Sequence, residues 1–224
     1  MIRATTPQHL RGTLIGIGIG AMLLLAGANA VAIEEPKYEV VKTYPDFELR
    51  RYAPYLVAET EVTGDFDEVG NSAFRILAAY IFGENRAQEK MEMTAPVNQR
   101  PAAGDGEKMA MTAPVTQRPK AGADADTYVL SFVMPSRYTL DTIPEPLSPE
   151  VNLREEPAKL VAVRGYSGRW TEANYREHES QLLAAVEREG LTPVGAPVYA
   201  RYNSPFSLWF LRRNEVMVEV EASQ

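Results

Sequence analysis

The sequence contains no cysteine and only two histidines, His9 and His178, among its 224 residues. A chain without cysteine forms no disulfide, no thiolate metal site and no cysteine nucleophile. Two histidines are too few for a multi-histidine metal centre, so many classes of metalloenzyme are excluded as well. Because cysteine usage is the usual record of redox environment, the compartment has to be inferred from other features of the chain.

An excess of positive charge is also lacking. The chain has 23 Lys and Arg against 30 Asp and Glu, which gives a net charge of −7. Nucleic-acid binding needs a basic face that neutralises phosphates, so we expect no nucleic-acid partner. The hydrophobic fraction of 45% is ordinary for a globular protein. The length allows one large domain or two small ones with a proper core.

The N-terminal segment, residues 1–32, has the pattern of a secretory signal peptide. Arg3 and Arg11 form a positive start, residues 13–33 carry no charge, and Ala28-Asn29-Ala30 is a suitable cleavage site. The alternative is an uncleaved membrane anchor, because the uncharged run reaches the roughly 20 residues that a span requires. Both interpretations export the domain that follows. We therefore expect a periplasmic or envelope-associated protein, attached to the membrane if the segment is retained.

One twelve-residue phrase occurs twice in the middle of the chain. It reads K-M-E-M-T-A-P-V-N-Q-R-P from Lys90 to Pro101 and K-M-A-M-T-A-P-V-T-Q-R-P from Lys108 to Pro119. Apolar residues alternate in each copy, which predicts strands that present their methionines to one side. The proline inside each copy favours an edge strand or a bulge. Methionines can fill a core, line a pocket or ligate haem iron, and the role of the second copy stays open.

The remaining periodicity predicts strands and two helices. The first helix runs from Asp65 to about Phe82, with Asp65 and Glu68 placed as a capping box. The second runs from Thr171 to Glu189, and the proline-rich stretch at 136–157 is predicted as a surface loop. Strands are predicted at residues 38–44, 47–53, 55–62, 127–134, 159–166, 197–202 and 214–221.

A weaker duplication relates the two halves of the chain. When the sequence is shifted by 104 positions, Leu56-Val57-Ala58 matches Leu160-Val161-Ala162, and Phe66 matches Trp170. Each match comprises a strand, a glycine, an aromatic residue and an acidic helix start. This predicts an α+β fold made of two β-α-β-β halves, joined into one antiparallel sheet or distorted barrel that carries two helices.

Four short motifs together resemble the SOUL haem-binding family. They are E-K-M-x-M-T-A-P-V, F-E-L-R-R-Y at 47–52, Y-N-S-P at 202–205 and R-N-E-V at 213–216. The resemblance covers nearly all of the chain after the N-terminal segment, about 36–222. It implies an eight-stranded distorted β-barrel with two helices, in agreement with the duplication. It also implies a haem or another tetrapyrrole as the bound ligand.

The resemblance implies that the tetrapyrrole lies in an apolar groove beside the first helix and nearby loops. Such a site needs apolar walls for the ring and cations for the carboxylates. The candidate walls are Phe66, Val69, Ala73, Leu77, Tyr80, Met91 and Met93, and the candidate cations are Arg86, Lys90, Arg212 and Arg213. The alternative is structural: the helix stripe packs on the sheet, and Glu215 pairs with an arginine of the R-N-E-V motif.

The axial iron ligand is where this sequence departs from the family pattern. Some members have a histidine in the early motif where this chain has Arg51, which does not normally ligate iron. Metal-free porphyrin is therefore expected to bind as well as haem. His178 is the remaining axial candidate, although a lone histidine on an apolar helix face is more often a core residue. Tyr52 and Tyr80 are weaker fallback ligands.

The sequence favours non-enzymatic binding of haem or a related tetrapyrrole, for buffering or carriage in the cell envelope. One alternative is an effector-binding or scavenging domain for apolar or cationic small molecules. Domains of this kind share the duplicated β-α-β-β architecture. Another is a tetrapyrrole-modifying enzyme, although the sequence shows no nucleophile–base pair or metal cluster. The sequence indicates no particular partner protein.

Overall fold

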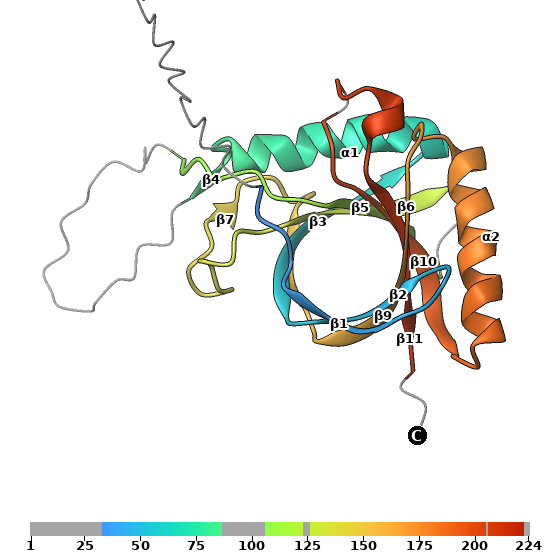
Figure 1. The fold of residues 1–224 in the computed structure, drawn as a ribbon. Coiled ribbons are helices and arrows are strands. Elements are labelled where there is room, and N and C mark those ends of the chain that lie inside the picture. The colour runs from blue at the N-terminus through green and yellow to red at the C-terminus, as the bar shows by residue number, and fades with distance from the viewer. Residues whose placement is uncertain (1–32, 87–105, 123–125, 205, 222–224) are drawn as a thin grey trace, which may run out of the picture. The chain divides into compact units, whose positions relative to one another are not determined.

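The computed structural model describes residues 33–86, 106–122, 126–204 and 206–221 (Figure 1). Residues from Ile33 onward form one compact unit. The predicted signal peptide, Lys90, Met91 and Met93 all lie outside the described residues, so these predictions stay predictions. Neither helix in the described part of the chain is long and apolar enough to cross a membrane.

The described residues of this unit form eleven strands, two α-helices and one 3-10 helix. The helices are α1 (Phe66–Ile81), α2 (Glu172–Arg188) and the 3-10 helix η1 (Trp209–Leu211). The strands are β1 (Tyr38–Thr43), β2 (Glu48–Tyr52), β3 (Tyr55–Thr63), β4 (Asn85–Arg86), β5 (Val115–Pro119), β6 (Thr127–Val133), β7 (Glu145–Pro146), β8 (Asn152–Glu156), β9 (Lys159–Tyr166), β10 (Pro193–Arg201) and β11 (Asn214–Val220).

Nine of the strands form one antiparallel sheet in the order β1-β2-β9-β11-β10-β5-β6-β3-β8. The sheet curls into a distorted barrel, and both helices lie outside the ring of strands (Figure 1). The α+β barrel predicted from the sequence is thus confirmed, with one strand more in its sheet than the resemblance implied. Its outermost strands, β1 and β8, each pair with a single described neighbour.

The sheet order also agrees with the predicted duplication. The strands β3, β5 and β6 accompany α1, and β9, β10 and β11 accompany α2 in the same chain order. The two halves meet where β5 pairs with β10, and the other strands follow in mirrored sequence on each side. Gly64 and Gly168, which precede the helices, have positive φ values of 148° and 136°. This left-handed backbone favours glycine at both matched positions.

Two apolar clusters occupy the two faces of the curled sheet. The larger packs the outer face against the helices and includes Leu77 of α1 and Leu182 of α2, both with no exposed surface. The smaller lies inside the barrel and contains Val161, Val163 and Met217. Side chains alternate between the clusters along each strand because successive residues point to opposite faces of a sheet.

The two helices begin differently. Asp65 is the N-cap of α1, but its side chain makes no capping hydrogen bond, so the predicted capping box is wrong. The N–H of Glu68 is bonded instead by the backbone carbonyl of Asp65, at 2.9 Å. Thr171 caps α2 with its side chain, which accepts a hydrogen bond from the N–H of Asn174. The sequence pattern thus identified both helix starts, but the only capping hydrogen bond that it predicted, at Asp65, does not form.

The second copy of the doubled phrase supplies a central strand. β5 starts at Val115, directly after the proline, and pairs with both β6 and β10. The prediction of an edge strand or bulge is therefore wrong, because Pro114 precedes the ladder and removes no hydrogen bond from it. The two methionines of this copy do not lie in a strand, and Met109 is buried whereas Met111 is 47% exposed.

The proline-rich stretch at 136–157 is more ordered than predicted. It contains β7 and β8, and β8 pairs with β3 at the end of the sheet. β8 reads Asn-Leu-Arg-Glu-Glu, which lacks the apolar alternation of a strand. Charged contacts stabilise it instead, since Arg154 donates two hydrogen bonds to Glu59 of β3 at 3.0 and 3.3 Å.

Residues before and after the first copy of the phrase lie close together. Asn85 donates a hydrogen bond to the carbonyl of Glu107 at 2.8 Å and accepts one from its N–H at 2.9 Å. Gly106 approaches Gly83 so closely that a Cβ on Gly106 would lie 1.6 Å from the Gly83 carbonyl oxygen. Only glycine fits at position 106 without a shift of the backbone.

Candidate functional site

Three of the four sequence motifs meet at one end of the barrel interior. Arg50 and Tyr52 come from β2, and Tyr202 follows β10. Arg213 directly precedes β11, and Glu215 is its second residue. The Glu215 carboxylate is only 2% exposed and accepts hydrogen bonds from Arg50 at 3.1 Å, from Arg213 at 3.0 Å and from the Tyr202 hydroxyl at 2.5 Å. The interpretation that Glu215 pairs with an arginine of its motif is confirmed.

The electrostatics of this cluster keep its groups in their ordinary charge states. Burial lowers the pKa of the Arg50 guanidinium, but the charge of Glu215 and the hydrogen bonds to Tyr52 and Glu48 together outweigh burial and raise the pKa overall. Burial raises the pKa of Tyr52 to about 12. Burial and the neighbouring Glu215 charge also raise the pKa of Tyr202. The tyrosines therefore remain hydrogen-bond donors around a charged carboxylate, and the cluster is a satisfied structural network.

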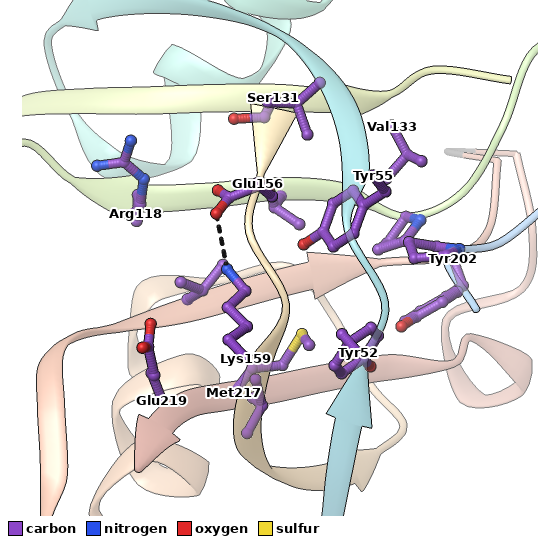
Figure 2. A pocket seen from close by; sticks show the side chains of 16 residues that line it. Tyr52, Tyr55, Arg118, Ser131, Val133, Glu156, Lys159, Tyr202, Met217 and Glu219 are labelled. Carbon is purple, nitrogen blue, oxygen red and sulfur yellow. Dashed lines mark hydrogen bonds and ion pairs between the residues drawn. The ribbon is translucent and has the colours of Figure 1, made fainter. Parts of the chain in front are cut away.

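Next to this cluster a small cavity fills the barrel interior (Figure 2). Tyr52, Tyr55 and Tyr202 form one wall, and an ion pair of 3.0 Å between Lys159 and Glu156 crosses another (Figure 2). The free volume is about 50 Å³. Small-molecule pockets typically measure about 300–1,000 Å³. The interior in this conformation admits water or a small group, but it is too small for a tetrapyrrole.

The predicted ligand walls on α1 belong to the protein core. All five side chains are at most 4% exposed and pack between the helix and the sheet: Phe66, Val69, Ala73, Leu77 and Tyr80. The Tyr80 hydroxyl donates a hydrogen bond of 2.7 Å to the carbonyl of Pro144. In this structure these residues pack the helix on the sheet, as the structural alternative predicts. Their role as ligand walls stays a prediction.

The predicted rim cations are not gathered at one place. Arg86 is exposed on β4, which belongs to a separate two-stranded sheet with β7. Arg213 forms ion pairs with Glu215 at 3.0 Å and with Glu35 at 2.9 Å. Arg212 alone of the described rim candidates lies beside a sizeable hollow on the surface, formed between the start of α2 and the segment before β11.

This hollow, which we call the tryptophan hollow, contains both tryptophans of the chain. It is lined by Arg169, Trp170, Thr171, Ser207, Leu208, Trp209 and Arg212. The Arg212 guanidinium lies 4.2 Å from the ring centre of Trp170, and that of Arg169 lies 5.8 Å from the ring centre of Trp209. The indole N–H of Trp170 donates a hydrogen bond of 2.7 Å to Asn214. The hollow is open to solvent and has a free volume of about 450 Å³.

Sequence reasoning identified only Arg212 among the residues of the tryptophan hollow. A signal was present, because Phe206-Ser207-Leu208-Trp209-Phe210-Leu211 is an apolar run between two polar motifs. The run has neither helical nor strand period, so a search for periodicity passes over it. Its large side chains are also exposed, which is unusual enough to indicate a binding surface.

His178 lies in the contact between α2 and β9. Its ring stacks on Tyr166 with ring centres 4.0 Å apart, and its Nδ1 is buried without a hydrogen-bond partner in the described part of the chain. Burial lowers the pKa of His178, and the positive charge of Arg164 lowers it further. His178 does not line the barrel cavity or the tryptophan hollow. Its assignment as an axial ligand stays a prediction.

Comparison with solved structures agrees with the architecture described above. The C-terminal domain of EcmrR superposes with a TM-score of 0.53 at 11% identity, covering 83% of this chain and 99% of that domain. A hydrolase encoded by lin2189 from Listeria innocua superposes with a TM-score of 0.53 at 13% identity, covering 79% and 92%. At such identities the likeness defines the fold alone: an α+β protein with a curled antiparallel sheet and two outer helices.

Sequence comparison identifies the family. Residues 33–219 match the profile of the SOUL heme-binding protein family, and the chain belongs to this family. It is 28% identical over 208 residues to heme-binding protein 2 of Homo sapiens, covering 87% of this chain and 93% of that protein. The corresponding mouse protein is 27% identical, with 86% and 93% covered. The resemblance drawn from the four motifs is confirmed.

Proposed function

We propose that this chain binds haem or a closely related tetrapyrrole in the tryptophan hollow. The observation that carries the proposal is the lining of the hollow, in which two indole rings and Leu208 lie beside two arginines. Its free volume of about 450 Å³ falls within the usual range for small-molecule sites, unlike the 50 Å³ of the barrel interior. Membership of a heme-binding family supports the same ligand.

The chemistry of the hollow suits a flat apolar disc with two carboxylates. Trp209 is 49% exposed and Leu208 is 59% exposed, so a porphyrin ring that covers them removes apolar surface from water. Arg169 and Arg212 lie at the same hollow, and a guanidinium pairs well with a carboxylate through two parallel hydrogen bonds. The ring would therefore rest on the apolar side chains while its propionates meet the arginines.

The proposed role is buffering or carriage without catalysis. An open surface hollow exchanges its ligand more readily than a closed pocket, which suits a carrier. Arg51, at the position where some relatives have a histidine, is on the solvent side of β2 and forms an ion pair of 3.6 Å with Glu39. Binding would thus depend on the ring more than on iron, so metal-free porphyrin would bind comparably. Residues 1–32 support a location in the cell envelope.

An absorbance titration of residues 33–224 tests the proposal, with ferric haem and metal-free protoporphyrin as ligands. We expect saturable binding of both, and we expect Trp209→Ala to weaken it by about tenfold or more through the loss of stacking surface. Phe82→Ala is the matched control, because Phe82 is a similarly exposed aromatic residue (54%) at the end of α1. Binding that is lost with Phe82→Ala and kept with Trp209→Ala would place the ligand beside α1 instead.

A further inference from the structure

Three large apolar side chains next to the tryptophan hollow take no part in lining it. Phe206 is 94% exposed, Phe210 is 52% exposed and Leu211 is 68% exposed. Together with Leu208 and Trp209 they place five large apolar residues in the six positions 206–211, which we call the apolar tip. We propose that the apolar tip inserts into the boundary between headgroups and acyl chains of a lipid bilayer, as an interfacial membrane anchor of the folded domain.

The exposure of the apolar tip is the first argument. An exposed apolar cluster costs solubility and marks a surface that is covered during function. A tetrapyrrole in the hollow would cover Leu208 and Trp209, but Phe206, Phe210 and Leu211 lie outside the lining of that hollow. These three residues therefore need another apolar medium, whether or not the hollow is filled.

The backbone of the apolar tip is the second argument. A segment that enters lipid must satisfy its polar backbone groups internally, because the apolar phase offers no partners. The N–H groups of Ser207, Leu211 and Arg212 bond to the nearby carbonyls of Ser204, Leu208 and Trp209 at 3.0, 2.9 and 3.3 Å, respectively. The N–H of Phe206 bonds to the hydroxyl of Ser204 at 3.3 Å. The turn and η1 thus carry much of their own hydrogen bonding into the interface.

The residues at the base of the apolar tip also suit a lipid surface. Arg169 and Arg212 lie beside the tip, where they would meet lipid phosphates while the apolar side chains enter below them. Trp209 sits between these layers, and tryptophan is enriched at membrane interfaces. The net charge of −7 opposes attraction to anionic membranes, so apolar insertion provides the binding and a zwitterionic surface suffices.

A protein partner fits these observations less well. A stable protein interface covers about 800 Å² on each partner. The apolar tip is a segment of only six residues, whereas each side of such an interface contributes about 20–30 residues. A bilayer needs no complementary shape and accepts a small apolar wedge. The geometry therefore favours lipid over protein as the medium that covers the apolar tip.

Tryptophan fluorescence tests the proposal on the full-length chain. The protein is mixed with phosphatidylcholine vesicles whose acyl chains are brominated, because bromine quenches an indole that enters the acyl region. We expect a blue shift and quenching from Trp209. A Trp209→Phe variant should remove most of this signal, since Trp170 is the only other tryptophan and is partly buried. Attachment through residues 1–32 alone would leave Trp209 unquenched.

Variants of the apolar tip then test which residues insert. Phe206→Ser combined with Leu211→Ser should lower vesicle partitioning of the Trp209 signal by about tenfold or more, without loss of the fold, because both side chains are exposed. Phe82→Ser, an exposed apolar residue elsewhere, should change nothing. No haem is present, so the result is independent of the proposed function.

Three outcomes would overturn the inference. The first is Trp209 emission that neither shifts nor is quenched by the brominated vesicles. The second is quenching that persists unchanged in the double variant. The third is self-association of the tip, which sedimentation velocity without lipid measures. A dimer that forms with rising concentration and is abolished by the same double variant would reject the membrane anchor.

Discussion

Arg50 and Glu215 form an ion pair inside the barrel, with Nη1 and Oε1 3.1 Å apart and side chains only 8% and 2% exposed. The two residues come from β2 and β11, which are both neighbours of β9. The pair thus crosses the strand between them and links two motifs that are distant in the sequence. A buried charge that loses its partner is costly, whereas a satisfied pair is tolerated.

Removing one member of this pair should destabilise the domain strongly. We expect Glu215→Ala to lower the free energy of unfolding by about 3–5 kcal/mol, because Arg50 and Arg213 keep their charge without the shared carboxylate. Arg50→Met combined with Glu215→Leu should cost clearly less than the sum of the single changes. Urea unfolding measures each variant. Arg51→Ala, on the exposed side of the same strand, is the control, and an equal loss there would contradict the argument.

His178 should make stability depend on pH. Burial holds its folded pKa below the ordinary value of 6.5, so the unfolded chain binds the proton more readily. The contribution of the neutral ring is complete above about pH 6.5 and is lost as the pH falls toward the lower folded pKa. His178→Phe should remove this pH dependence. The duplication suggests this substitution, because Phe74 lies 104 positions before His178. Unfolding midpoints measured across this pH range test the prediction. It is rejected if the midpoint changes with pH by the same amount in His178→Phe and in the unaltered protein.

Glu156 should add a second pH dependence in a more acidic range. Burial raises its pKa, but hydrogen bonds from Arg154 and Lys159 outweigh burial and hold the pKa below its usual value. The resulting stability is present above the unfolded pKa near 4.5 and is lost as the pH falls below it. Glu156→Gln should flatten this acid limb of the stability curve. Acid unfolding followed by circular dichroism measures it, and an unchanged curve would contradict the assignment.

The doubled phrase leads to a prediction about two deletions of equal length. Removing 88–105 or 102–119 leaves one copy joined directly to Lys120, and the two products differ at three positions: Gln88 for Gly106, Glu92 for Ala110 and Asn98 for Thr116. Because Asn85 and Glu107 are hydrogen-bonded to each other, the residues flanking the shorter connection already lie close together. We expect the first product to fold with nearly native stability.

The second deletion should be the less stable of the two. It places Gln88 where Gly106 approaches the Gly83 carbonyl, and a Cβ there would lie 1.6 Å from that oxygen. Adding Gln88→Gly should remove the difference in thermal unfolding midpoint between the two products. If both deletions unfold the domain, the first copy is itself required. If Gln88→Gly has no effect, the close approach is not what separates the two products.

The fold could be predicted from the sequence because its evidence is repeated. Apolar periods predict both helices and most strands of the sheet, and the match between Phe66 and Trp170 relates the two halves. β8 escaped this reasoning because Arg154 and its neighbours form the strand through charged contacts that have no apolar period. Likewise Pro114 falsely indicated an edge, since the strand begins one residue later.

The candidate site was harder to predict for a physical reason. An apolar helix stripe such as that of Leu77 shows that something covers it, but periodicity does not distinguish a sheet from a ligand. In this structure the sheet covers it. The tryptophan hollow is assembled from Trp170 and Trp209, which are brought together only by the arrangement of α2 against β11. No local pattern contains that information.

The barrel can widen most easily between the two outermost strands of its sheet. β1 and β8 each have one described hydrogen-bonded neighbour, whereas the strands between them have two. The two-residue turn at Pro157 and Ala158 connects β8 to β9, which lies two strands from β1 in the sheet order. The circumference can therefore increase between β1 and β8 without breaking a described backbone ladder. Amide exchange should be fastest along β1 and β8, and any guest of the small interior would enter there.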